Sequence, residues 1–320
     1  MARSTDLDVL VGRARAGDPR AVGRLLTIVE DGAAPLRPLM AMIAAHAGTS
    51  HVIGLTGAPG VGKSTTTSAL VRHLRARGQR VGVLAVDPSS PFSGGALLGD
   101  RIRMQEHALD PGVYIRSMAS RGHLGGLSAA TPQAIRVLEA AGCATILVET
   151  VGVGQSEVEI AGAADTTVVL LAPGMGDGIQ AAKAGILEIG DVFAVNKADR
   201  DGADSTAREL RHMISLGTAA REGDWTPPVL QVIATRGDGV DQLAGAIEEH
   251  RVWLERTGAG LTRRRERAGA EIQGIALAAL QARFAAVGGD GALARLAQDV
   301  AAGRLDAFTA ADRIVAGLTG

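Results

Sequence analysis

A short glycine-rich run that ends in a lysine and a serine is the part of this sequence best suited to bind phosphate. Residues 57 to 64 read Gly57-Ala58-Pro59-Gly60-Val61-Gly62-Lys63-Ser64, a full match to the phosphate-binding loop pattern. The glycines let successive backbone N–H groups converge on phosphate oxygens at the start of a helix. In this pattern the lysine reaches the β- and γ-phosphates and the serine hydroxyl ligates Mg²⁺. The loop, with Thr65 directly after it, therefore predicts a nucleoside triphosphate site.

A second short motif points to the base. The residues Asn196-Lys197-Ala198-Asp199 follow the apolar run from Val192 to Val195, so they lie at the carboxyl end of a predicted strand, where α/β sheets bind ligands. An aspartate there can accept hydrogen bonds from N1–H and from the exocyclic amino group of guanine. Adenine presents neither donor on that edge, and an unpaired buried carboxylate is costly. The motif therefore predicts binding of GTP and GDP rather than adenine nucleotides.

Acidic residues at the ends of two other predicted strands are candidates for hydrolytic chemistry. Asp87 closes one strand and is followed by a loop that leads to Asp100. Glu149 closes another strand, and Gly152 follows as a switch glycine whose N–H can donate to the γ-phosphate. Carboxylates at this edge of a sheet can hold Mg²⁺ directly or through its waters. Each acid taken singly can also be a helix cap or a solvated loop residue.

The elements that must position these residues form an α/β pattern. Apolar runs alternate with helical segments from His51 to about Arg256, which predicts a mostly parallel sheet with helices on both faces. The phosphate loop lies between a strand from His51 to Thr56 and an amphipathic helix from Thr65 to Arg77. The other strand candidates are Val81 to Val86, Val113 to Arg116, Ala144 to Val148, Thr166 to Leu171, Val192 to Val195 and Val229 to Ile233.

Helical periodicity flanks this region on both sides. We predict an N-terminal helical extension over residues 1–47, a nucleotide-binding domain over 48–256 and a C-terminal helical region over 257–320. In the extension, Asp18-Pro19 reads as a helix cap followed by a first-turn proline. The basic cluster Arg263-Arg264-Arg265 is expected to form a solvated face. An exposed apolar side on the C-terminal helices would favour dimerisation, with packing back onto the domain as the alternative.

Composition agrees with a folded protein that does not bind polyanions. Of the 320 residues, 46% are hydrophobic and the formal net charge is -1, which gives no electrostatic case for nucleic acid or an anionic membrane. The single cysteine, Cys143, excludes an internal disulfide framework. The amino terminus lacks an apolar signal segment, and no apolar stretch approaches membrane-spanning length. These features predict a cytoplasmic location and no membrane contact.

Four longer sequence strings resemble those of one known protein family. In this order the sequence contains GAPGVGKST, VDPSSPFSGGALLGDRIRM, ETVGVGQSE and NKAD, and with them it resembles the methylmalonyl-CoA mutase-associated GTPases, the MeaB group, also known as ArgK-type transport kinases. The resemblance extends from about Asp6 to Ile247. Glu149 stands where most GTPases have aspartate, and this is distinctive of the group. The resemblance implies a P-loop GTPase fold with a C-terminal helical arm through which family members dimerise.

The same resemblance assigns roles to single residues. The loop from Gly174 to Gln180 resembles an additional switch that faces the partner. The segment Ala234-Thr235-Arg236 occupies the place of the last base-contacting loop, although its Thr-Arg departs from the usual Ser-Ala-Lys. The family's active-site positions are matched by Lys63, Asp87, Asp100 and Glu149, its Mg²⁺ site by Ser64 with these acidic residues, and its guanine contacts by Asn196, Lys197 and Asp199.

The function that the resemblance implies is that of a GTP-hydrolysing chaperone. Such proteins gate adenosylcobalamin loading of a B12-dependent acyl-CoA mutase and protect that enzyme from inactivation. Three alternatives remain open. A metallochaperone GTPase should show a Cys-x-Cys or histidine cluster, whereas Cys143 stands alone. A small-molecule or protein kinase would need a phospho-acceptor pocket and a base, a role that Asp100 could fill. A nucleotide-sensing scaffold without enzymatic activity is the third.

Overall fold

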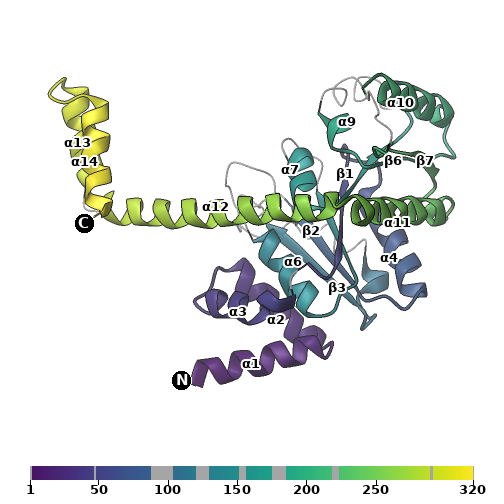
Figure 1. Ribbon diagram of the computed structural model, residues 1–320, viewed down its shortest axis with the longest axis horizontal. Helices are drawn as coiled ribbons and strands as arrows, with labels where there is room; N and C mark the ends of the chain where they lie inside the picture. The colour runs from purple at the N-terminus through teal and green to yellow at the C-terminus, as the bar shows by residue number, and fades with distance from the viewer. Residues whose placement is uncertain are drawn as a thin grey trace. The chain divides into compact units, whose positions relative to one another are not determined.

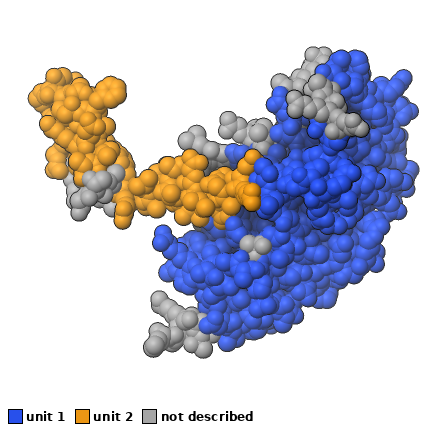
Figure 2. Space-filling model, in the orientation of Figure 1, with its two compact units in different colours: residues 1–264 blue, residues 265–320 orange. Residues whose placement is uncertain are grey.

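The computed structural model describes most of the chain. Residues 1, 47, 88–103, 120–129, 151–155, 175–184, 218–222, 289–290 and 320 lie outside the described part. The chain forms two compact units, residues 1–264 and residues 265–320, drawn in blue and orange in Figure 2.

In the part of the chain that the structure describes, seven parallel strands form one sheet in the order β3-β2-β4-β1-β5-β6-β7 (Figure 1). Every residue of β4, β5 and β6 is buried, which explains why these strands read as continuous apolar runs. All predicted strands are confirmed, and β3 is longer than expected. The strands are β1 His51–Thr56, β2 Val81–Asp87, β3 Val113–Ala119, β4 Thr145–Thr150, β5 Thr166–Leu171, β6 Val192–Asn196 and β7 Val229–Val232.

Helices cover both faces of this sheet. On one face α4 (Lys63–Ala76) and α11 (Val240–Thr257) pack against Leu55 and Leu147. On the other face lie α6 (Thr131–Ala140), α7 (Ser156–Ala163) and α10 (Ala203–Gly217). Short segments complete the unit, namely η2 (Gln105–His107) and α9 (Ile186–Ile189). The predicted parallel sheet with helices on both faces is thus confirmed.

The N-terminal extension is helical and packs on the sheet domain. It contains α1 (Ala2–Arg15), α2 (Pro19–Glu30), α3 (Leu36–Ile43) and the short η1 (Ala44–His46). The Asp18 carboxylate accepts hydrogen bonds from the backbone N–H groups of Arg20 and Ala21 at 2.9 and 3.3 Å, as the predicted cap requires. Apolar side chains of α2 and α3 join the core formed with α6 and β3. This burial holds the extension on the edge of the sheet domain.

The C-terminal region is helical as predicted. It consists of α12 (Ala259–Gly288), α13 (Ala292–Ala301) and α14 (Ala307–Thr319). Among the described helices, none is both long and apolar enough to cross a membrane. Large apolar side chains are exposed along this region, namely Ile272, Ile275, Leu277, Leu280, Phe284, Leu293, Phe308 and Val315.

The start of α12 is anchored to the amino-terminal edge of the sheet by two arginines. The Arg263 guanidinium donates to both carboxylate oxygens of Asp191, which precedes β6, at 2.9 and 2.8 Å. Arg264 lies 3.4 Å from the carboxylate of Asp165, which precedes β5. The expectation of a solvated basic face is therefore wrong for Arg263, because its guanidinium forms an ion pair with Asp191, which is distant in the sequence.

Two histidines lie beside this anchor, His250 fully buried and His51 partly buried. The Thr166 hydroxyl lies 2.8 Å from His51 Nε2 and 2.8 Å from His250 Nδ1. His250 Nε2 in turn lies 3.3 Å from the Asp191 carboxylate. Burial lowers the pKa of both imidazoles to about 4, although Asp165 and Asp191 act in the opposite direction. Both rings are therefore neutral near pH 7.

We expect these neutral histidines to make the protein less stable in mild acid. Between pH 6.5 and pH 4 the unfolded chain binds a proton on each imidazole and the folded chain does not, so the free energy of unfolding rises with pH across this window. The expected loss between pH 7 and pH 5 is about 2 kcal/mol for each histidine and about 4 kcal/mol for the two together, measured by urea denaturation. His51→Gln should reduce this dependence by about half, because glutamine keeps a hydrogen-bonding group near Thr166 but does not titrate, whereas His250 still does. An equally steep dependence in that variant would contradict the assignment.

Candidate functional site

The phosphate loop connects β1 to α4 in the conformation that its glycines permit. Gly57, Gly60 and Gly62 have φ values of 137°, 80° and 98°, a region that other residues rarely adopt. A side chain at Gly57 would also collide with the backbone of Leu170, and one at Gly62 with the amide of Asn196. The loop therefore needs glycine at all three positions for conformation, and at Gly57 and Gly62 for space as well.

Lys63 opens helix α4 and its side chain turns back over the loop. Its ammonium donates to the carbonyl oxygens of Gly57 at 2.6 Å and Ala58 at 3.0 Å, and the residue is only 8% exposed. The positive charge is thus fixed at the helix amino terminus, where the peptide dipoles also favour an anion. This arrangement fits a phosphate-binding lysine.

Two hydroxyls of α4 meet a carboxylate of β4. Ser64 Oγ donates to Glu149 Oε1 at 3.1 Å, and Thr67 Oγ1 lies 2.6 Å from Glu149 Oε2. All three side chains are buried, and Glu149 is 2% exposed. Because hydroxyl and carboxylate oxygens are the donors that Mg²⁺ prefers, Ser64 and Glu149 fit a Mg²⁺ site beside the phosphate loop. Within the described residues, no group of three or more His, Cys, Asp or Glu side chains gathers around a metal position.

The other predicted acidic and switch residues lie only partly within the described chain. Asp87 is the last residue of β2, which runs beside β4 so that Val86 pairs with Thr150. The strand end that carries Asp87 is thus adjacent to the one that carries Glu149, and the Asp87 side chain itself lies outside the described part. Asp100, Gly152 and the switch residues 175–180 also lie outside it.

The base motif is connected directly to the phosphate loop. Asn196 ends β6, and its amide donates to the carbonyl of Val61 at 2.8 Å while its side-chain oxygen accepts from the N–H of Ala234 at 3.1 Å. Lys197, with φ 59°, donates from its ammonium to the carbonyl of Gly60 at 2.6 Å. Asn196 therefore links three loops at the carboxyl edge of the sheet.

The remaining base-contact candidates are on the surface. Asp199 is exposed. Thr235 and Arg236 are also exposed, and the Arg236 guanidinium donates to the Asp238 carboxylate at 2.8 Å. The backbone of the segment 234–236 thus contacts Asn196 through Ala234. The Arg236 side chain instead forms an ion pair with Asp238, two residues further along the chain.

Thr67 is the residue that the sequence analysis missed at this site. It lies three positions after Ser64 on α4, a spacing that places both residues on one face of a helix. That spacing is a signal present in the sequence, but only the pairing of α4 with β4 reveals which carboxylate it reaches.

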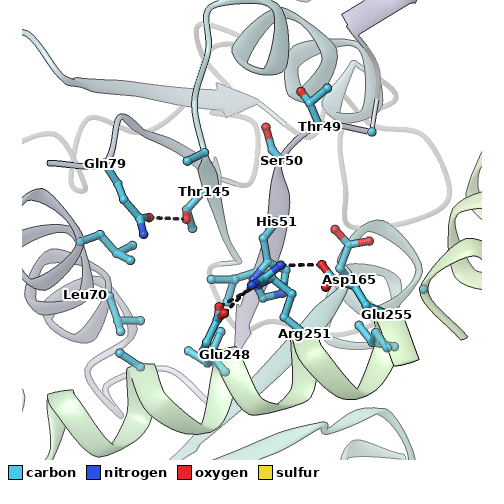
Figure 3. Close-up of a pocket in the computed structure, with 18 of the residues that line it drawn as sticks. Thr49, Ser50, His51, Leu70, Gln79, Thr145, Asp165, Glu248, Arg251 and Glu255 are labelled. Atoms are coloured by element: carbon cyan, nitrogen blue, oxygen red, sulfur yellow. Dashed lines mark hydrogen bonds and ion pairs between the residues drawn. The ribbon is translucent and has the colours of Figure 1, made fainter. Parts of the chain in front are cut away.

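A cavity of about 930 Å³ lies at the opposite, amino-terminal edge of the sheet (Figure 3). Its walls include His51, Gln79 and Thr145, and the Arg251 guanidinium is bound there by Glu248 and Glu255. Mutual pairing satisfies these charges, and none of the predicted nucleotide residues lines the cavity. The candidate site is therefore the carboxyl edge.

Comparison with known proteins agrees with this geometry. A family model described as "Methylmalonyl Co-A mutase-associated GTPase MeaB" matches residues 22–288. A Pyrococcus abyssi protein named as a GTPase is 46% identical over 315 residues, which is 98% of this chain and 97% of that protein.

Two further proteins are similar over different shares of their length. The mouse protein named methylmalonic aciduria type A homolog, mitochondrial, is 41% identical over 199 residues, which is 62% of this chain and 48% of that protein. The crystal structure of an LAO/AO transport system kinase superposes with a TM-score of 0.71 at 26% identity, covering 99% of this chain and 98% of that one.

The family match confirms the predicted resemblance, and the relatives named as GTPases support GTP hydrolysis as the activity. The structure contains a phosphate loop with Lys63 turned over it, a Ser64–Glu149 contact and a base motif that is hydrogen-bonded to the loop. The chain is a P-loop GTPase and belongs to the MeaB family of methylmalonyl-CoA mutase-associated GTPases.

Proposed function

We propose that this GTPase is a chaperone for an adenosylcobalamin-dependent acyl-CoA mutase of the methylmalonyl-CoA mutase type. In this role GTP binding and hydrolysis gate cofactor loading and protect the mutase from inactivation. The observation that carries the proposal is the family match over residues 22–288, whose description names the mutase. The name of the mouse relative agrees with it, since methylmalonic aciduria refers to the same acyl group.

The nucleotide site comprises the phosphate loop, the switch glycine and the base loops. The loop N–H groups and Lys63 bind the phosphates, and Asp199 binds the guanine edge, held in place through Asn196 and Lys197. Gly152 senses the γ-phosphate. The full set of contacts is Gly57, Ala58, Pro59, Gly60, Val61, Gly62, Lys63, Ser64, Thr65, Gly152, Asn196, Lys197, Asp199, Ala234, Thr235 and Arg236.

The catalytic residues are Lys63, Asp87, Asp100 and Glu149. Ser64 and the three acids hold Mg²⁺, which when bound neutralises charge on the phosphate oxygens. Glu149 and Ser64 are already in contact, which supports this assignment. Lys63 stabilises the charge that develops on the transferred group. The side chains of Lys63 and Glu149 are both buried, which limits screening of their charges by water.

The C-terminal region over 257–320 serves dimerisation in this proposal. The exposed apolar side chains of α12, including Ile272, Ile275 and Leu280, support it, because a folded protein rarely leaves such a row uncovered. A homodimer would bury them in an isologous contact. The extension over 1–47 and the domain over 48–256 complete the organisation.

The mutase proposal is tested by nucleotide-dependent capture. The purified GTPase, immobilised in GDP or in a non-hydrolysable GTP analogue, is incubated with extract from its source cell, and retained proteins are identified. We expect an acyl-CoA mutase that binds cobalamin, retained to different extents in the two nucleotides. Lys63→Ala, which removes the phosphate-binding ammonium, should abolish the difference. Retention of no cobalamin enzyme in either state would overturn the proposal.

A kinase activity is the second candidate, and the similarity to a protein named as an LAO/AO transport system kinase favours testing it. Incubation with γ-labelled GTP separates the two chemistries. Label in inorganic phosphate alone indicates water as the acceptor, whereas label on a metabolite or protein indicates phosphotransfer.

A further inference from the structure

Thr67 is a buried threonine one helical turn into α4, directly below the phosphate loop. Its hydroxyl lies 2.6 Å from Glu149 Oε2 and 3.0 Å from the carbonyl oxygen of Lys63. The residue is fully buried, so water does not compete for either contact. Two acceptors therefore face a single hydroxyl proton.

The carboxylate is the stronger of these two acceptors. Hydrogen bonds from a hydroxyl to an ionised oxygen are short, about 2.5 to 2.7 Å, and stronger than those to a neutral carbonyl. The distance to Glu149 lies in that range and the distance to Lys63 does not. Thr67 thus donates mainly to Glu149, unlike an ordinary threonine that bonds only back to its own helix.

Each of two hydroxyls on α4 contacts a different oxygen of the Glu149 carboxylate. Ser64 contacts Oε1 and Thr67 contacts Oε2, so the carboxylate plane is fixed relative to the first turn of the helix. An aspartate at this position would be one methylene shorter, so its carboxylate would lie further from the two hydroxyls of α4. The glutamate and the threonine therefore form a matched pair.

We infer that Thr67 is a positioning residue for Glu149, which it orients so that the other carboxylate oxygen stays directed at Ser64 and the Mg²⁺ site. This inference rests on the proposed role of Glu149. With Mg²⁺ bound, Ser64 would hold the ion, and the Thr67 hydroxyl would keep the Glu149 side chain from rotating.

Thr66 provides a matched control on the same helix. Its hydroxyl donates to the carbonyl of Gly62 at 3.0 Å, the same type of bond four residues back, and it is equally buried. Replacing Thr66 or Thr67 with valine keeps the shape and removes one buried hydroxyl. Only the replacement at 67 removes a bond to Glu149.

The test compares Thr67→Val, Thr67→Ser and Thr66→Val in the full-length protein. The first readout is the gain in affinity for a non-hydrolysable GTP analogue on adding Mg²⁺, measured by calorimetry. The second is the single-turnover rate of GTP hydrolysis. For Thr67→Val we expect each to fall about 10-fold, the effect of losing one charge-assisted hydrogen bond. Thr67→Ser should restore both, and Thr66→Val should resemble the wild type.

A double variant shows whether Thr67 acts through Glu149. In a Glu149→Gln background, Thr67→Val should cause little further change in the Mg²⁺ effect, because the pair acts as a unit. An undiminished effect in that background, or an equal effect of Thr66→Val, would overturn the inference. If Thr67→Val fails to fold, Glu149→Asp takes its place in the test. In Glu149→Asp the gain in affinity on adding Mg²⁺ should fall about as strongly as expected for Thr67→Val. A gain equal to that of the wild type would refute the matched pair.

Failure of the inference is distinguishable from failure of the proposed catalytic role. If Glu149→Gln loses both the Mg²⁺ effect and the hydrolysis rate while Thr67→Val loses neither, only the role of Thr67 is wrong. If Glu149→Gln behaves as the wild type in both measurements, the proposed role of Glu149 is itself wrong.

Discussion

Replacing Glu149 with alanine is expected to lower the single-turnover rate of GTP hydrolysis by about 100-fold, an effect typical of losing one group that acts on the reacting centre. The affinity for GDP should stay nearly unchanged, because the loop amides and Lys63 that bind the diphosphate are not altered. The reason is the position of the carboxylate, 3.1 Å from the Ser64 hydroxyl at the proposed Mg²⁺ site. Rapid-quench measurement of phosphate release, with GDP titrated by calorimetry, gives both values.

Glu139 offers a matched control for this variant. It is also a buried glutamate, on α6, where its carboxylate accepts a hydrogen bond from the N–H of Gly48 at 2.9 Å. Burial raises the pKa of the Glu139 carboxyl, and the hydrogen bond from Gly48 acts in the opposite direction. Glu139→Ala should affect stability without affecting hydrolysis. Unchanged turnover in Glu149→Ala would remove Glu149 from the catalytic residues.

Replacing Asp199 with alanine is expected to reduce the preference for GTP over ATP by about 100-fold or more, because the two guanine donors lose their acceptor. The free energy of unfolding should change by less than about 0.5 kcal/mol, since Asp199 is exposed. Competition binding of the two nucleotides measures the preference, and denaturation measures the stability.

Asp201, an exposed aspartate two residues further along, is the control for Asp199. Asp201→Ala removes the same charge from the same loop and should leave the nucleotide preference unchanged. If Asp199→Ala weakens GTP and ATP binding equally, the residue contributes general binding or folding rather than base selection.

The links made by Asn196 and Lys197 bear on how the two halves of the site cooperate. Asn196 reaches the carbonyl of Val61, and Lys197 reaches that of Gly60, so the base loop and the phosphate loop share hydrogen bonds in this structure. A side chain added at Gly62 would collide with the Asn196 amide and so disturb the bond from Asn196 to Val61. We therefore regard Asn196 as a connector between the two loops in addition to its proposed place beside the base.

The sequence by itself determined the local parts of this protein. The phosphate loop, the base motif and the strands that precede them are written in contiguous residues, because glycine conformation and apolar runs are local properties. The same holds for the Asp18 cap. Each of these predictions depended only on residues that are neighbours in the chain.

Only the tertiary structure decided which distant residues meet. The contact of Thr67 with Glu149 joins residues 82 positions apart, and that of Asn196 with Val61 joins residues 135 apart. The ion pair of Arg263 with Asp191 likewise contradicted the expectation of a solvated face. Sequence periodicity shows that a side chain faces inward, but the strand order and the helix that covers each strand determine its partner, and these depend on packing of the whole sheet.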